Sequence, residues 1–435
     1  MIAIIGGGIS GLSLGWHLQK KDIPYKIFEA SAHAGGNIKS EKIGDYLIER
    51  GPNSILADTE LIELIKEIGL EDNILYPQDV SKNRYIFKKG KYQKLPAGPA
   101  FLFSNFFSLN AKLSVFKEYN KKSQGTENES VADFFERRFC KEIVEYAVNP
   151  FVAGIYAGDP NKLLVRKTFP QLYELEKEYG SVIKGFLKTR KSTSRKVSFS
   201  FKNGMQELPN AIAEQVNIEY TSKIESINKN ENGNFVLATK DEEIEASKLV
   251  FSLPSFSAAQ FLESISEYKS DIFNAVPYPK MYVIHTAFKK ATIGWLPNGF
   301  GGLHPKKEGL FTAGSIWSSS LFPSRCPNDE FLFTSFVGGS QFEQQASEPK
   351  EVIQQKVTEE LQKLYSIKAQ PVFQELTYWE NAIPQYTVET EPAHEALEEL
   401  QKEGIYHCTN WKDGVSVADC LKKGKELAEK LAKSN

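Results

Sequence analysis

The sequence predicts a multidomain α/β protein (α+β in its overall arrangement) whose dinucleotide-binding domain is assembled from separated segments. Three observations lead to this prediction. The chain has 435 residues, enough for two or three domain-sized units. It begins with a short apolar strand that runs into a glycine-rich turn and a helix, "IAIIGGGISGLSLGWHL". A second strand, turn and helix lies near the other end of the chain, in "HCTNWKDGVSVADCLKKGKELAEKL" at 407–431.

The composition excludes several classes of function. Hydrophobic residues make up 41% of the chain, charged residues 25%, and the net charge is −2. Such a chain has no strong positive field, so nucleic acid is not the expected partner. The four cysteines are scattered without a C-x-x-C pair, which predicts no metal site and reduced thiols in a cytoplasmic setting. The N-terminal apolar run is too short for a signal peptide, and no apolar stretch approaches the length of a membrane span.

The glycine-rich turn has the spacing of a dinucleotide-binding loop. Gly6, Gly8 and Gly11 fit G-x-G-x-x-G between the strand "AIIG" and the helix "LSLGWHLQKK". The first glycine makes the tight turn, the second lets the backbone approach a pyrophosphate, and the third lets helix and strand pack closely. The next strand, "YKIFEA", ends at Glu29, where an acidic side chain can bind ribose hydroxyls. Strand, glycines, helix, strand and acid in this order predict a Rossmann-type unit.

The residues after Glu29 indicate FAD as the cofactor. "EASAHAGGN" and "ERGPNS" resemble the extended signature of the FAD-dependent amine oxidase and protoporphyrinogen oxidase superfamily, E-A-x-x-R-x-G-G-[RK]. His33 stands where the superfamily has arginine, and Asn37 stands at the usual basic position. NAD enzymes with one Rossmann unit lack this second loop. The FAD-contacting residues that the resemblance implies here are Ile9, Ser10, Ala30, His33, Gly35, Gly36, Asn37, Gly51, Pro52, Asn53 and Ser54.

The C-terminal strand-turn-helix resembles the segment with which this superfamily holds the flavin ring. "NWKDGVSVADCL" is similar to G-N-[YW]-x-x-G-V-[SG]-x-x-D-C-[IL], with Thr409 where glycine is common. The resemblance places Gly414, Val415, Ser416 and Val417 at the isoalloxazine. Negative charge accumulates there in the reduced flavin, so a helix N-terminus would stabilise it. The resemblance also places Trp411 beside the ring.

A third segment completes the predicted cofactor domain. Residues 218–254 alternate like a small β-meander broken by the turn "NENGN". In the superfamily such a segment offers a backbone amide to the adenine, here that of Ile224. The expected FAD-binding domain therefore combines 1–80, 200–272 and 400–435. A helical insertion, 81–199, and a β-sheet substrate-binding domain, 273–399, are expected between these stretches.

Most of the remaining chain resembles the oxygen-dependent protoporphyrinogen oxidases within this superfamily. The matching stretches include "RYIFKKGKYQKLPAGP" (84–99), "NPFVAGIYAGDP" (149–160), "GSIWSSSLFPSRCP" (314–327) and "WENAIPQY" (379–386), in the order of that family. The resemblance implies a planar apolar substrate with carboxylates on one edge, held in an apolar slot with a cationic clamp. The substrate-binding residues it implies are Arg84, Asn53, Gly154, Phe300, Phe311 and Phe336.

The implied reaction is the six-electron oxidation of protoporphyrinogen IX to protoporphyrin IX, with three O2 reduced to three H2O2. The flavin takes the hydride, so no protein side chain is expected to be catalytic. Coproporphyrinogen III is an alternative substrate. Amine or polyamine oxidase activity is an alternative reaction, because Lys280 lies where those enzymes carry a lysine near the flavin. A flavin-binding protein without turnover is the alternative from a different class.

One apolar segment bears on the location of the protein. "GPAFLFSNFFSL" (98–109) is either a core helix or a surface that dips into a bilayer. The resemblance favours peripheral attachment to the cytoplasmic membrane through the helical insertion. The sequence does not determine the oligomeric state, and a homodimer is one option.

Overall fold

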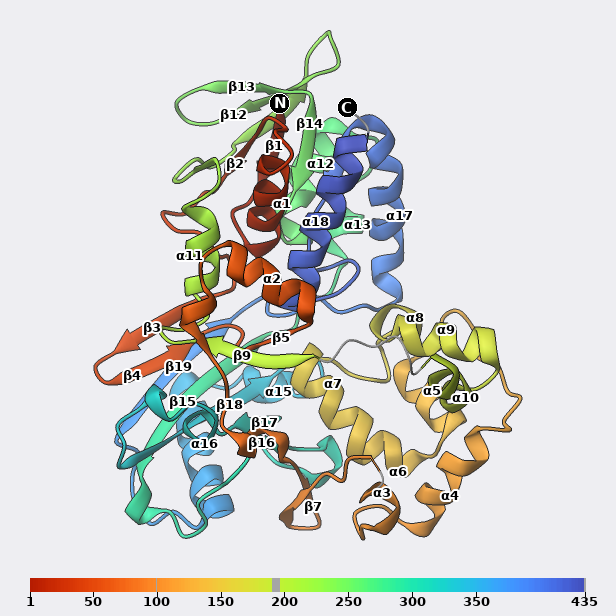
Figure 1. The fold of residues 1–435 in the computed structure, drawn as a ribbon, viewed down its shortest axis with the longest axis vertical. Coiled ribbons are helices and arrows are strands. Elements are labelled where there is room, and N and C mark those ends of the chain that lie inside the picture. The colour runs from red at the N-terminus through yellow and green to blue at the C-terminus, as the bar shows by residue number, and fades with distance from the viewer. Residues whose placement is uncertain (99, 190–195, 434–435) are drawn as a thin grey trace.

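The computed structural model describes residues 1–98, 100–189 and 196–433, so Pro99 of the apolar segment lies outside the described residues. The chain forms three parts (Figure 1). The upper part surrounds a parallel sheet and carries both chain ends. The lower part is built on a second large sheet, and a group of helices lies beside that sheet.

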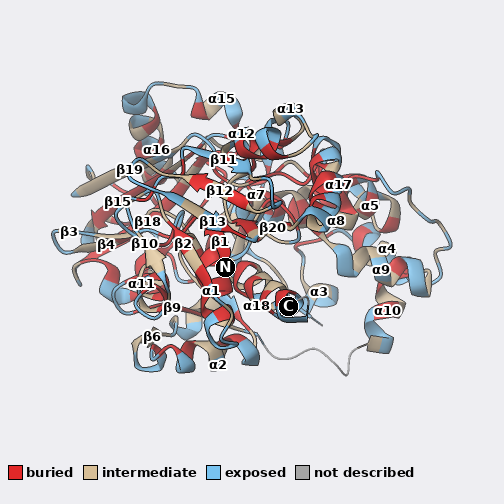
Figure 2. Ribbon diagram, turned by 90° about the horizontal axis from the view of Figure 1, so that it is seen from above, coloured by how far each residue is buried: buried red, intermediate tan, exposed pale blue. Residues whose placement is uncertain are grey.

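The upper part contains a five-stranded parallel sheet with the strand order β10-β2-β1-β14-β20. Its strands are β1 (Ile2–Ile5), β2 (Tyr25–Phe28), β10 (Ile218–Glu219), β14 (Lys248–Phe251) and β20 (Ile405–His407). The central strands are apolar and buried along nearly their whole length, because helices cover both faces (Figure 2). The strands come from three distant stretches of the chain, which confirms the predicted α/β class.

Two separate hydrophobic cores flank this sheet. Helices α1 (Ile9–Gln19), α2 (Thr59–Glu67), α11 (Glu207–Ala213) and α18 (Val417–Lys433) enclose the first. The second lies under α12 (Ser255–Ile265), α13 (Ser270–Asn274), α17 (Glu391–Leu400) and the antiparallel strands β11 (Ser226–Lys229), β12 (Phe235–Ala238) and β13 (Glu243–Ala246). In the first core Gly424 lies directly against Ser13, whose hydroxyl donates to the Leu421 carbonyl at 2.7 Å. This close approach fixes α18 beside α1.

Short antiparallel strands lie between the upper and lower parts (Figure 1). One group is the hairpin β3 (Ser40–Ile43) and β4 (Tyr46–Glu49), and the other is β5 (Ile55–Ala57), β9 (Val197–Phe201) and β6 (Ile74–Leu75). The loop that joins β4 to β5 is the "ERGPNS" segment, so it passes between the two large sheets.

The lower part is a seven-stranded sheet with the order β19-β15-β18-β17-β16-β7-β8. Its strands are β7 (Arg84–Lys88), β8 (Lys91–Lys94), β15 (Met281–Lys289), β16 (Gly301–Leu303), β17 (Gly314–Ile316), β18 (Glu330–Gly338) and β19 (Phe373–Trp379). Helix α16 (Lys350–Tyr365) covers one face over a third core. The sequence assigned β7 and β8 to the helical insertion, whereas the structure pairs β7 with β16, residue Arg84 opposite Gly301. Their alternating pattern is too short to reveal a partner more than two hundred residues away.

The helical insertion follows β8. Its helices are α3 (Ala100–Phe103), α4 (Leu109–Glu118), α5 (Val131–Arg138), α6 (Lys141–Ile143), α7 (Asn149–Tyr156), α8 (Val165–Thr168), α9 (Pro170–Tyr179) and α10 (Val182–Thr189). A buried lysine on β7 joins them to the sheet: Lys88 donates to the Phe106 carbonyl at 2.6 Å and to Glu142 at 2.9 Å. Its ammonium also lies 4.0 Å from the centre of the Tyr146 ring.

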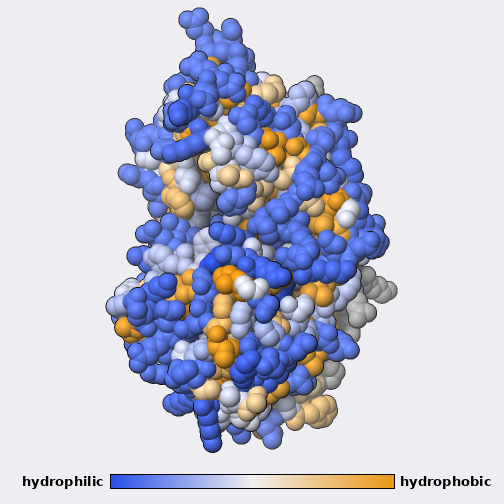
Figure 3. Space-filling view, turned by 90° about the vertical axis from the view of Figure 1, so that its left-hand side faces the viewer, coloured by the Kyte–Doolittle hydropathy of each residue, from blue (hydrophilic) through white to orange (hydrophobic). Residues whose placement is uncertain are grey.

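One face of the molecule is predominantly hydrophilic. On the face shown in Figure 3, hydrophilic residues cover most of the upper part and small hydrophobic patches interrupt the lower part. Among residues 1–98, 100–189 and 196–433, no helix has both the length and the apolar character needed to cross a membrane. No cluster of histidine, cysteine and acidic residues suited to a metal ion occurs in this same set.

Candidate functional site

The glycine-rich turn between β1 and α1 leaves open space beside Gly8. A Cβ atom at Gly11 would overlap the carbonyl oxygen of Gly6, and Gly6 itself has a φ of 107°. A Cβ at Gly8, in contrast, would meet no atom within 4 Å. Gly6 and Gly11 are therefore required by packing, whereas Gly8 borders open space at the N-terminus of a helix. That is the space into which a pyrophosphate fits.

Glu29 is held beside this turn at the end of β2. Its Oε2 accepts the Gly7 N–H at 2.7 Å, and its Oε1 accepts the Ser31 N–H at 2.8 Å and the Ser31 hydroxyl at 2.7 Å. A carboxylate offers about four acceptor positions, so capacity remains for a ribose hydroxyl. The segment with Ile224 lies nearby, because the Ser222 N–H donates to the Glu29 carbonyl at 2.9 Å. Ile224 itself is buried in the second core.

The second glycine pair runs alongside the first loop. Gly35 donates its N–H to the Gly7 carbonyl at 2.9 Å and forms a parallel bridge with Gly8. Ala30, His33, Gly36 and Asn37 are exposed around it. Gly51, in the loop after β4, packs so closely on the Asn37 carbonyl that a Cβ would overlap it. The two loops predicted from sequence are thus brought to one edge of the parallel sheet, with Pro52, Asn53 and Ser54 half-buried beside them.

Two residues not singled out from the sequence tie this edge to the seven-stranded sheet of the expected substrate-binding domain, called the substrate sheet below. Arg50 bonds Glu41 at 2.6 Å, Thr377 at 2.7 Å and Glu375 at 3.1 Å, the last two on β19. Trp379, also on β19, donates its indole N–H to the Arg50 carbonyl at 2.9 Å. Their motifs, "ERGPNS" and "WENAIPQY", were visible in the sequence, but their mutual contact depends on tertiary structure.

The start of α18 presents free backbone donors at the same edge of the sheet. Gly414 donates its N–H to the Tyr386 hydroxyl at 2.8 Å. Ser416 and Asp419 form a reciprocal cap, in which the Ser416 N–H and hydroxyl donate to the Asp419 carboxylate and the Asp419 N–H donates to the Ser416 hydroxyl. Within the described part of the chain, the N–H groups of Val415, Val417 and Ala418 have no partner. Of the four predicted residues, Val415 and Val417 therefore keep donors for a ligand.

The structure separates two predicted site residues from these groups. Trp411, expected beside the flavin ring, is 0% exposed and packs in the second core near Phe273 and His394. Its indole N–H donates to the Leu253 carbonyl at 3.0 Å. Phe311 lies on the α16 side of the substrate sheet, where its N–H donates to Glu360 at 2.6 Å. Aromatic residues in loops carry no periodicity, so the sequence could not assign them to a face.

The other predicted substrate residues lie on or beside the opposite face of that sheet. Arg84 places its guanidinium 4.2 Å from the centre of the Phe300 ring. Phe336 packs with Ala157 and Met281. Gly154, on α7, lies so close to Leu303 of β16 that a Cβ would contact its side chain at 2.8 Å. This face therefore combines aromatic and aliphatic walls with one exposed arginine. Lys280 is exposed, and its carbonyl accepts the Gly339 N–H at 2.8 Å.

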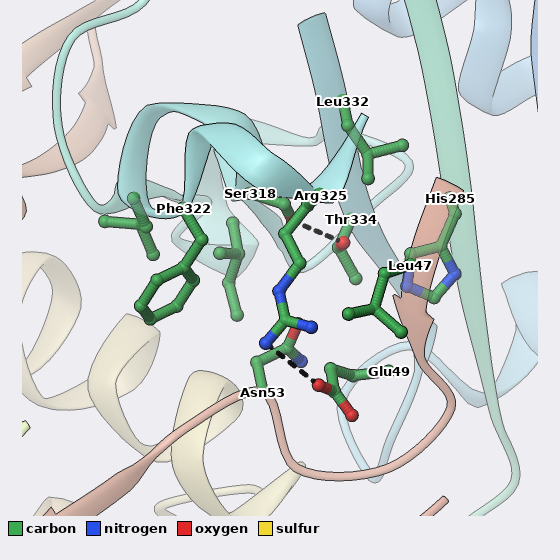
Figure 4. A pocket seen from close by; sticks show the side chains of 11 residues that line it. Leu47, Glu49, Asn53, His285, Ser318, Phe322, Arg325, Leu332 and Thr334 are labelled. Carbon is green, nitrogen blue, oxygen red and sulfur yellow. Dashed lines mark hydrogen bonds and ion pairs between the residues drawn. The ribbon is translucent and has the colours of Figure 1, made fainter. Parts of the chain in front are cut away.

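A small cavity adjoins this face beneath the "ERGPNS" loop (Figure 4). Its volume is about 10 Å³, room for one water molecule. Asn53, Ile316 and His285 line it, together with Glu49 and Arg325, whose charged groups are 3.2 Å apart. Burial raises the pKa of Glu49 to about 7, against the opposing effect of the Arg325 charge. Arg325 also donates to the Ser200 hydroxyl at 2.7 Å, which links β9 to the substrate sheet.

His285 should make the protein sensitive to acid. Among the described residues neither ring nitrogen has a hydrogen-bond partner, and burial together with the Arg50 charge lowers its pKa from 6.5 to about 3. Between pH 6.5 and pH 3 the His285 ring binds a proton in the unfolded chain but not in the folded chain. The free energy of unfolding is therefore unaffected by His285 above pH 6.5 and falls as the pH decreases below that value. At pH 5 the loss is about 2 kcal/mol. In urea titrations, His285→Phe should show a smaller fall in stability from pH 7 to pH 5 than the parent; equal falls would contradict this.

Comparisons with known proteins agree with this arrangement. A family model described as flavin containing amine oxidoreductase matches residues 9–432. A mitochondrial protoporphyrinogen oxidase of Nicotiana tabacum is 31% identical, over 98% of this chain and 94% of its own length. The coproporphyrinogen III oxidase of Bacillus subtilis strain 168 is 28% identical, over 98% and 96%. An Exiguobacterium structure provisionally named protoporphyrinogen oxidase has a TM-score of 0.82 at 21% identity, covering 100% and 99%, a likeness that shows the fold.

Proposed function

Because the chain belongs to the flavin-containing amine oxidoreductase family and is an FAD-dependent oxidoreductase, we propose that it oxidises protoporphyrinogen IX to protoporphyrin IX. The observation that carries the proposal is the substrate face, where exposed Arg84 stacks on Phe300 at the edge of an apolar wall. Two relatives named above act on porphyrinogens, according to their names. Exposed Lys280 and buried Trp411 give no support to an amine oxidase site.

We place FAD along the edge formed by the glycine-rich turn, Glu29 and the start of α18. The open space at Gly8 would receive the pyrophosphate, and Glu29 would bind the ribose of the adenosine half. The free N–H groups of Val415 and Val417 would be the donors available to the isoalloxazine. When bound, FAD would supply the chemistry of hydride acceptance and of electron transfer to O2, which over three two-electron rounds corresponds to three H2O2.

The protein's own contribution is to bind, orient and desolvate the substrate. Arg84 pairs with a carboxylate on one edge of the macrocycle, because a planar guanidinium matches a carboxylate in two-point contact. Phe300 keeps the guanidinium in place from below, and Phe336 with the Gly154–Leu303 contact forms apolar wall. Gly154 lets α7 approach β16 closely, which sets the position of this wall. Holding the reacting carbon in position is how such a site accelerates transfer.

The reaction is tested directly with purified protein and fresh protoporphyrinogen IX in air. Porphyrin fluorescence should rise with about three peroxides per porphyrin, as six-electron oxidation through a flavin requires. Coproporphyrinogen III is run in parallel, since it carries four carboxylates in place of two. A flat trace from FAD-loaded protein with both substrates would refute the proposal, whereas preference for coproporphyrinogen would reassign the substrate within the same class.

Arg84→Ala should weaken substrate binding. A hydrogen bond to a charged group contributes about 1.5–3 kcal/mol, so KM should rise about 10- to 150-fold while kcat changes less. Arg84→Lys should give an intermediate KM, because a lysine makes only a point contact. Lys91→Ala, on the neighbouring strand β8, removes another exposed charge and serves as the control. If both alanine variants behave alike, Arg84 does not bind the carboxylate.

We also propose that α3 and α4 attach the protein to a bilayer surface. Phe103 is 85% exposed and Leu109 72% exposed, and Leu113 and Phe116 extend the same apolar surface. Burying one large apolar side chain gains about 1.5–3 kcal/mol. Phe103→Ser with Leu109→Ser should therefore lower partitioning onto phosphatidylcholine vesicles more than tenfold in flotation assays. Leu56→Ser, at an exposed position on β5, is the control and should bind as the parent does.

A further inference from the structure

One lysine gathers the backbone carbonyls of the loop that precedes α18. Lys423, in the second turn of that helix, donates its ammonium to the carbonyls of Lys412 at 2.7 Å and Gly414 at 2.8 Å, and to the Thr409 carbonyl. Three carbonyl oxygens thus point at one cation from a single loop. An ammonium has three protons, so this set satisfies it completely.

This arrangement decides where the loop's N–H groups point. In a trans peptide the C=O and the following N–H lie in one plane and point in opposite directions. Since the Gly414 carbonyl is directed at Lys423, the Val415 N–H is directed away from it, toward the outside of the loop. Val415 is one of the residues at the helix start whose N–H is free within the described chain. Lys423 therefore orients the free Val415 N–H through the Gly414 carbonyl, without contacting the N–H itself.

The charge of Lys423 remains available to act on its surroundings. Its neighbours Lys412, Lys422 and Lys425 each form an ion pair with a glutamate. No such pair joins Lys423 to a carboxylate in the part of the chain that the structure describes; it is bonded to neutral carbonyls instead. Its side chain is half-buried, where water screens a charge less than at the surface. The cation thus lies beside the positive end of α18, where the Asp419 carboxylate also caps the first turn.

We propose that Lys423 is a positioning residue for the flavin: it orients the Gly414–Val415 peptide and supplies positive charge that favours the reduced, negatively charged form of the cofactor. The inference rests on the proposed placement of FAD at the start of α18, and it is independent of the substrate. Its observable consequence is a higher midpoint potential than the same protein would have without this cation.

The experiment measures the two-electron midpoint potential of bound FAD by anaerobic dye equilibration, with no porphyrinogen present. Lys423→Met should bind reduced FAD about tenfold more weakly relative to oxidised FAD, which lowers the potential by about 30 mV. Lys422→Met is the matched control, because it removes an adjacent charge from the exposed side of the same helix. It should leave the potential at the parent value.

Two further variants cover the case in which Lys423→Met does not retain FAD. Lys423→Arg keeps the charge, whereas Lys423→Gln removes it and keeps hydrogen-bond donors. The arginine variant should stay near the parent potential and the glutamine variant should fall by about the same 30 mV. Equal potentials in these two variants, or an unchanged potential in Lys423→Met, would overturn the inference. If the midpoint potential falls as predicted but the protein does not oxidise porphyrinogens, the inference about Lys423 stands and only the proposed substrate is refuted.

Discussion

Gly8→Ala is expected to weaken FAD binding while leaving the FAD-free protein as stable as the parent. Gly8 has a φ of −68° and a ψ of 170°, values that alanine adopts readily, and its Cβ would enter open space. The added methyl group would occupy the position of the pyrophosphate. Such overpacking costs about 1–3 kcal/mol, which corresponds to a rise in Kd of about 5- to 150-fold. Fluorescence titration of the FAD-free protein measures the Kd, and thermal unfolding measures its stability.

Gly11→Ala is the matched comparison, because it adds the same methyl group three residues later. There the Cβ overlaps the Gly6 carbonyl oxygen, so backbone must move in the protein itself. This variant should lose FAD and also unfold at lower temperature without FAD. If the two variants destabilise the FAD-free protein equally, Gly8 does not face open space. If Gly8→Ala binds FAD normally, the pyrophosphate lies elsewhere.

Arg138→Met should have the largest effect on stability, and the effect should be confined to the helical insertion. Arg138 and Glu118 are both 0% exposed, and the Arg138 Nε donates to Glu118 at 2.8 Å. Arg138 also bonds Glu176 at 2.9 Å and the Gly180 carbonyl at 3.0 Å. Removal of the guanidinium leaves the buried Glu118 carboxylate without its cation, whereas Glu176 keeps its ion pair with Arg137 at 2.7 Å. Breaking a buried pair in this way costs about 3–5 kcal/mol.

The carboxylate that would be stranded has a second role. Glu118 accepts the N–H groups of Val182 at 2.9 Å and Ile183 at 3.1 Å, so it caps the start of α10. In Arg138→Met, proteolysis should therefore cut between 100 and 189 at lower urea concentrations than in the parent, while the FAD spectrum persists. Lys117→Met, at the exposed neighbour of Glu118, should change neither. Simultaneous loss of the FAD spectrum would show that the insertion does not unfold separately.

The sequence by itself determined the cofactor loops, because their geometry is local. Gly6, Gly8 and Gly11 follow one strand and begin one helix, and Glu29 ends the next strand, so their relative placement needs no distant contact. The same holds for the cap formed by Ser416 and Asp419, which is complete within four residues. The α/β class and the FAD cofactor followed from these signals and are confirmed by the family match.

Only the tertiary structure decided which of the predicted site residues remain available to a ligand. Trp411 is in the right sequence position but lies in a core, and Phe311 packs on the α16 side of its sheet. β7 joins β16 across a large gap in sequence. The Tyr386 hydroxyl accepts the Gly414 N–H. Lys423 bonds the Gly414 carbonyl, so the Val415 N–H of the same peptide points away from Lys423. These outcomes depend on contacts between segments far apart in the chain, and a side chain's identity does not encode which distant partner will bury it or bond to it.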